Sequence, residues 1–140
     1  MRSPALAVLL AFALGGCSRD LGPEASYRAL ARAVAERDAD KAWSLLSSGS
    51  QKRLDALARE AAARAPGVVP ASGRQLLLGD ASLASRKIAS LELVDSSGDR
   101  ALLKVAAEGL PPREVQLVRE GGRWRVELPE PDSARARGAR

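Results

Sequence analysis

The residue types that carry most enzyme and metal chemistry are scarce in this chain. It contains a single cysteine, Cys17, and no histidine. Without histidine, neither a Ser-His nor a Cys-His catalytic pair nor a His-ligated metal site can form. One cysteine excludes an internal disulfide and any Cys-x-x-Cys metal or redox motif. We therefore expect no cofactor and no metal, and the chemistry to explain is that of Cys17.

Tyr27, Asp38 and Asp40 are the remaining candidates for acid-base chemistry. Tyr27 lies on the apolar side of an expected helix, where its ring packs in the core and its hydroxyl reaches the rim. Asp38 and Asp40 lie at the start of the next helix, where carboxylates cap the backbone and face the positive end of the dipole. Because structural roles account for all three, we predict no catalytic residue.

The residues before Cys17 indicate export. Arg2 supplies the positive charge near the N-terminus that is typical of an export signal. Ten apolar residues follow from Ala5 to Leu14, and then the small residues Gly15 and Gly16. Such a run forms a helix of about 15 Å, half of a ~30 Å hydrocarbon core, so it predicts a cleaved leader and not a membrane-spanning helix. The alternative for Cys17 is an incidental cysteine behind an ordinary leader.

Leu14-Gly15-Gly16-Cys17 resembles the lipobox of bacterial lipoprotein precursors. The resemblance implies lipid attachment at Cys17: its thiol receives diacylglycerol, the leader 1–16 is removed, and the new amino group is acylated. Two or more acyl chains hold a protein on a membrane stably, whereas one binds marginally. Ser18, and not aspartate, follows the cysteine, which in the Gram-negative family implies the outer membrane, with the protein facing the periplasm.

The charge and the aromatic content of the chain limit the classes of binding partner that we expect. The net charge of +5 is spread along the chain, a pattern typical of a solvated surface. Aromatic residues make up only 3% of the chain, and base-stacking and sugar-binding surfaces depend on them. We therefore expect no nucleic-acid partner; the expected contacts are the membrane, through the lipid anchor, and an envelope protein or cell-wall component.

Helical signals fill the first half of the mature chain. Apolar residues at helical spacing predict a helix from Pro23 to Arg37, and Asp38 caps a second, shorter one. A third helix is expected to start near Ser48, where Ser48 and Gln51 form a capping box. Pro66-Gly67 ends it.

From Lys87 onward the apolar period changes to two. Leu76-Leu77-Leu78, before this change, fits a helical turn or a short strand, and the helical turn is the favoured prediction because Ser72 and Gln75 offer capping groups. Four strands are then predicted, separated by a turn at Asp95 to Asp99, by a Pro-Pro break, and by a hairpin turn at Gly121-Gly122. The inward positions are Ala89, Leu91 and Leu93; Ala101, Leu103, Val105 and Ala107; Val115 and Leu117; and Trp124, Val126 and Leu128. Helices on one face of an antiparallel meander make an α+β fold.

Two stretches resemble the NTF2-like (cystatin-like) superfamily and its small lipoproteins. They are "ERDADKAWSLLS" at Glu36 to Ser47 and "VQLVREGGRWRVELP" at Val115 to Pro129. The family often has Gly-Asp at the helix break, where this chain has Arg37-Asp38. The resemblance implies a cone of helices on a curved four-stranded sheet. The expected organisation is a signal peptide (1–16), a lipidated tether (17–22), the NTF2-like α+β domain (23–129) and a mobile tail (130–140).

Three functions fit these features. The first is a membrane-anchored, non-catalytic binding or assembly module of the cell envelope. The second is a carrier or sensor of an apolar small molecule, which a cavity between Trp43, Trp124 and Leu54 would favour; the third is a small isomerase-like or hydrolase-like enzyme. On the sheet, charged residues of the last two strands are expected to form cross-strand Arg–Glu pairs or to meet an acidic partner. These residues are Arg113, Arg119, Arg123, Arg125 and Glu127.

Overall fold

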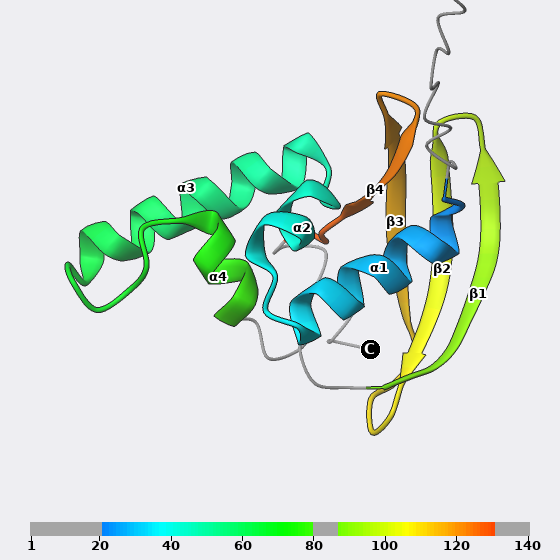
Figure 1. Cartoon of the computed structure of the whole chain (residues 1–140), viewed down its shortest axis with the longest axis horizontal. Helices are drawn as coiled ribbons and strands as arrows, with labels where there is room; N and C mark the ends of the chain where they lie inside the picture. Colours follow the sequence, from blue (N-terminus) through cyan, green and yellow to red (C-terminus); the bar gives the residue numbers. More distant parts are fainter. Residues whose placement is uncertain (1–20, 80–86, 131–140) are drawn as a thin grey trace, which may run out of the picture.

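The chain folds into a helical layer against a four-stranded sheet (Figure 1). The computed structural model describes residues 21–79 and 87–130. The leader, Cys17 and residues 131–140 of the expected tail lie outside this part. The elements are α1 (Pro23–Ala35), α2 (Ala39–Ser44), α3 (Ser48–Arg64), α4 (Gly73–Gly79), β1 (Ile88–Ser97), β2 (Arg100–Ala107), β3 (Arg113–Glu120) and β4 (Arg123–Glu127). The expected α+β class is confirmed.

The break between α1 and α2 depends on two adjacent residues. These are Arg37 and Asp38; the other end of α1 begins at Pro23, whose missing N–H leaves no hydrogen bond unmade in the first turn. Arg37 has a φ of 57°, in the left-handed region that normally favours glycine and that ends helices. Asp38 then caps α2, and its carboxylate accepts a hydrogen bond from the N–H of Lys41 at 3.1 Å. The predicted cap of the second helix is confirmed.

The cap of α3 differs from the sequence prediction by one residue. Ser47, and not Ser48, is the N-cap, and its hydroxyl accepts a hydrogen bond from the N–H of Ser50 at 3.1 Å. The cause is long-range: Leu46 forms a parallel bridge with Val126, which holds Ser47 in extended backbone before the helix begins. The expected capping-box partner Gln51 instead donates to the carbonyl of Trp43 at 2.7 Å.

The sheet is an antiparallel meander in the order β1-β2-β3-β4, as predicted. On the last three strands most of the predicted inward residues are confirmed; Leu103 and Leu117, for example, are fully buried. Ala107 is only half-buried, and Leu128 lies just beyond the end of β4, partly buried against the core. The β3–β4 turn uses Gly121 and Gly122, both at positive φ, as such a two-residue hairpin requires. At the β4 edge, the N–H of Ser47 donates to the carbonyl of Val126, so this edge is partly covered.

The prediction for β1 is wrong in two respects. The register shifts between Ile88 and Ser90 and again between Leu93 and Asp95. Each irregularity disturbs the alternation of side chains, so Ile88 and Leu91 pack on the core while Leu93 is 40% exposed. In addition, β1 extends to Ser97, so the expected turn at Asp95 to Asp99 is confined to its last residues.

The core lies between the sheet and α1 with α2. α1 crosses one face of the sheet, while α3 and α4 pack on each other beyond β4, remote from β1 (Figure 1). The expected helical turn at Leu76 to Leu78 is confirmed as part of α4, and Leu77 is buried in the core. The opposite face of the sheet carries the polar side chains of β2, β3 and β4, and no helix within residues 21–79 and 87–130 packs across it.

Candidate binding groove on the open sheet face

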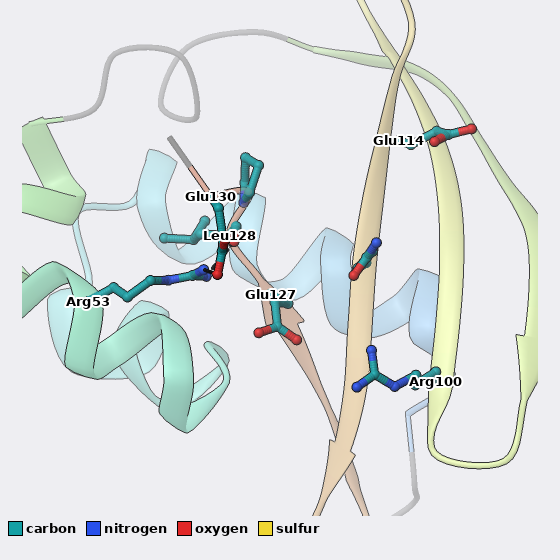
Figure 2. A pocket seen from close by; sticks show the side chains of 8 residues that line it. Arg53, Arg100, Glu114, Glu127, Leu128 and Glu130 are labelled. Atoms are coloured by element: carbon teal, nitrogen blue, oxygen red, sulfur yellow. Dashed lines mark hydrogen bonds and ion pairs between the residues drawn. The ribbon is translucent and has the colours of Figure 1, made fainter. Parts of the chain in front are cut away.

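A polar hollow lies on the open face of the sheet, between the sheet and α3. Its volume is about 400 Å³. The strand register explains its floor, because Gln116 and Glu127 are cross-strand neighbours on this face. We call it the open-face groove; Figure 2 shows its lining, which is Arg53, Arg100, Glu114, Gln116, Glu127, Leu128, Pro129 and Glu130.

Arg53 builds one wall of the groove. Its guanidinium donates to the carbonyl of Leu128, to the hydroxyl of Ser50 at 3.3 Å, and to the carboxylate of Glu130 at 3.3 Å. Ser50 is fully buried and also accepts from the N–H of Leu128 at 2.8 Å. These bonds join α3 to the segment after β4. Arg53 therefore shapes the groove, and its guanidinium is already hydrogen-bonded within the protein.

Apart from Arg53 and Glu130, which pair with each other, the polar side chains of the groove have no partner among the described residues. In the part of the chain that the structure describes, Arg100, Glu114, Gln116 and Glu127 form no side-chain hydrogen bond and no ion pair. Arg100 points from β2 toward β3, whereas Glu114 leans over β2 (Figure 2). The groove therefore offers one guanidinium, one amide and two carboxylates, which suits a polar ligand carrying charges of both signs.

A shallower hollow extends the groove toward β1. Its volume is about 170 Å³, and it shares Arg100 and Gln116 with the groove. The rest of its lining is Asp95 of β1, Ala101 and Leu102 of β2, and Leu117 of β3. The combined trough therefore crosses all four strands, and a ligand lying in it would run across the strands and not along them.

The start of α3, beside the groove, is already occupied by a side chain. The carboxylate of Glu120 accepts from the N–H of Ser48 at 3.1 Å and from its hydroxyl at 3.0 Å. The carboxylate of Glu127 lies on the same side, since a Cβ on Gly49 would stand 3.6 Å from it. Two acidic residues of the sheet thus face the positive end of α3.

The acid-base candidates named from the sequence do not converge. Tyr27 is 4% exposed, and its hydroxyl accepts a hydrogen bond from the guanidinium of Arg113 at 3.0 Å. Asp38 caps α2, and Asp40 forms an ion pair with Arg74 of α4. The expected structural role of each residue is the one observed. Cys17, the predicted lipid-attachment residue, lies outside the described residues.

None of the three hollows found among residues 21–79 and 87–130 is lined by Trp43 or Trp124. Trp124 is 7% exposed and belongs to the core, and the guanidinium of Arg119 lies 5.2 Å from its ring centre. Trp43 packs partly buried against the same core. A separate apolar hollow of about 340 Å³ does contain Leu54, but its other lining residues are Leu76, Leu77, Gly79 and Leu128.

The expected grouping of the sheet arginines is partly wrong. Arg113 and Arg119 alternate in phase with Val115 and Leu117, so they lie on the helix-facing side of the sheet. There they hydrogen-bond to Tyr27 and stack on Trp124. The cross-strand Arg–Glu pairs are not found among the described residues, although Glu120 is the register partner of Arg123.

Sequence reasoning did not identify the groove as a site. The alternation of β3 and β4 assigned Glu114, Gln116 and Glu127 to the polar face, which was the available signal. Nothing local indicated that Arg53 would meet Leu128, 75 residues further along the chain.

Comparison with known proteins identified no relative of this chain. No protein-family model, no curated protein and no solved structure matched the chain. Within residues 21–79 and 87–130, no group of three or more acidic, histidine or cysteine side chains could hold a metal ion. No helix in the same ranges is long and apolar enough to cross a membrane.

Proposed function

We propose that this protein is a lipid-anchored, non-catalytic binding module of the cell envelope. The observation that carries the binding role is the contrast between the two faces of the sheet. The helix-facing side is a packed core, and every buried side-chain nitrogen or oxygen that the structure describes has a hydrogen-bond partner. The open face instead carries a groove in which Arg100, Glu114 and Glu127 have no such partner among the described residues, whereas Arg53 and Glu130 pair with each other. Uncommitted charges gathered in a hollow are available to a ligand.

The anchor is proposed at Cys17, within the Leu-Gly-Gly-Cys lipobox. Acylation there would hold the domain on the membrane through residues 18–22, and Ser18 favours the outer membrane. A short tether keeps the domain close to the lipid surface, so the partner would be another envelope protein or a cell-wall component.

We further propose that the fold is of the NTF2-like type. The helix break supports this, because Arg37 adopts the left-handed backbone that the family's glycine would adopt without strain. Asp38 then caps the following helix, as the aspartate of the family's Gly-Asp pair would. The closing β3–β4 hairpin over the helices agrees with the second resembling stretch.

One observation favours a second candidate function, the carriage of an apolar small molecule. The hollow between α3, α4 and the end of β4 is lined by Leu54, Leu76, Leu77 and Leu128. Its volume of about 340 Å³ is within the range of small-ligand sites. Its ligand would be apolar, because leucine side chains dominate the lining.

Site-specific photo-crosslinking in cells tests the binding role. A benzophenone amino acid at Gln116, in the floor of the open-face groove, should give a discrete adduct with one envelope component. The same probe at Lys52, exposed on α3, is the control. Adducts of equal yield from both positions would contradict a specific site, as would no adduct from Gln116. An adduct from Leu76 and not from Gln116 would favour the apolar carrier.

A further inference from the structure

Three arginines gather at one end of the open sheet face. Arg100 and Arg125 are both cross-strand neighbours of Val118, so they flank it in one row. Arg123 lies two residues before Arg125 on β4 and therefore on the same face. We call these three residues the arginine corner; it lies beside the β1–β2 and β3–β4 turns.

The three guanidiniums of the arginine corner are not paired with carboxylates in the described part of the chain. Glu120 is the register partner of Arg123, but its carboxylate is held by Ser48 at the start of α3. None of the three guanidiniums forms an ion pair within residues 21–79 and 87–130. Asp99, in the β1–β2 turn, is the nearest acidic residue in sequence to Arg100 and makes no ion pair with it. The three guanidiniums are therefore free to contact an anionic surface beyond the two turns, while the nearby charges of Glu120 and Asp99 lower the net positive charge at this end.

The start of α1 lies toward the same end of the sheet. α1 packs against β1 and β2, and its first residues lie beside the half of β2 nearer the two hairpin turns (Figure 1). Residues 18–22 separate Cys17 from α1 and span at most about 17 Å when extended. A membrane holding Cys17 would therefore lie within reach of this end of the domain.

We propose that the arginine corner rests on the anionic headgroups of the membrane that holds the lipid anchor. This inference rests on the proposed acylation of Cys17. The short tether raises the local concentration of headgroups around the corner, so that contacts too weak to act alone become effective. Each arginine near an anionic surface raises the equilibrium constant for docking about five-fold at low salt. Three arginines together therefore raise it about 100-fold. An acidic protein partner would satisfy the same charges, but no tether brings one near.

The test uses the acylated protein in vesicles of phosphatidylcholine, with and without phosphatidylglycerol. Because Cys17 is acylated, a new cysteine at Ser97, the register partner of Arg100, takes a single fluorophore. Energy transfer to a dye at the vesicle surface then reports docking. We expect strong transfer on anionic vesicles, and weak transfer on neutral ones or at high salt. Replacing Arg100, Arg123 and Arg125 by glutamine should abolish the difference between the two lipid compositions.

A second variant removes the same charge elsewhere. Arg135, Arg137 and Arg140 are replaced by glutamine, and the dependence on lipid composition should persist. Equal transfer on both lipids overturns the inference, as does loss of the dependence in the tail variant alone. The inference is also overturned if the acylated protein docks equally on both lipids and the arginine corner is instead needed to bind an acidic protein. Protein without acyl groups overturns the anchor itself and this inference with it, an outcome that the intact mass distinguishes from the others.

Discussion

The carboxylate of Glu120, at the last residue of β3, accepts hydrogen bonds from both the backbone N–H and the hydroxyl of Ser48, in the first turn of α3. The two residues are 72 positions apart in the chain. This contact links the helical layer to the sheet and places a negative charge at the positive end of a helix of 17 residues. It also turns the carboxylate away from an ion pair with Arg123, its register partner.

Replacing Glu120 by alanine should lower the free energy of unfolding by about 1 kcal/mol, because the N–H of Ser48 loses its acceptor and the dipole its counter-charge. Urea unfolding of the purified protein measures the change. Glu114→Ala, which removes an exposed carboxylate without a partner, should stay within about 0.5 kcal/mol of the wild type. Equal losses in both variants would show that the Glu120–Ser48 contact contributes nothing of its own.

Trp124→Ala should cost about 3–5 kcal/mol, since it truncates a large core side chain and leaves a cavity. The ring is 7% exposed and lies on the helix-facing side of β4. Circular dichroism during urea unfolding follows the change without relying on tryptophan fluorescence. Val68→Ala, at a side chain that is 81% exposed, is the control and should have little effect. A loss well under 1 kcal/mol for Trp124 would mean that the β4 register is different.

Gly73 is required by close packing at the start of α4. A Cβ there would stand 2.8 Å from the ring of Trp43 and 2.8 Å from the backbone nitrogen of Asp55. Gly73→Ala should therefore destabilise the protein by about 1–3 kcal/mol through overpacking. Gly79, at the other end of α4, has nothing within 4 Å of such a Cβ. Gly79→Ala should be neutral or stabilising by up to about 1 kcal/mol, and the reverse ranking in thermal unfolding would contradict this packing.

Arg37→Gly should raise the stability. The positive φ of Arg37 disfavours any side chain, and glycine relieves this strain at some cost in unfolded-state entropy. We expect a net gain of about 0.5–1 kcal/mol in urea unfolding. Arg28→Gly, in the middle of α1, is the matched control and should destabilise by about 1 kcal/mol. Destabilisation by Arg37→Gly would show that the break between α1 and α2 does not depend on a left-handed residue.

Local rules predicted most of the fold. Proline and aspartate at helix starts, and apolar alternation along β2, β3 and β4, act over a few residues and are visible in the sequence. Where the prediction failed, distant contacts decided the outcome. The cap of α3 moved to Ser47 because Leu46 pairs with Val126, and the alternation along β1 is interrupted by irregular pairing with β2.

The open-face groove depends even more on contacts between residues that are distant in the sequence. Alternation placed Gln116 and Glu127 on the polar face, but two further facts depend on the folded chain. Arg53 reaches Leu128 from another element, and Glu120 bonds to Ser48 and not to Arg123. A single sequence contains no local signal for either contact, so neither the groove nor the arginine corner could be derived from it.

The intact mass of the protein extracted from membranes tests the central claim most directly. The account predicts a chain that begins at Cys17 and carries diacylglycerol with a further acyl group. It also predicts that Cys17→Ser abolishes the added mass and the membrane association together. A chain without fatty acid, whether it begins at Met1 or at any residue other than Cys17, would contradict the account.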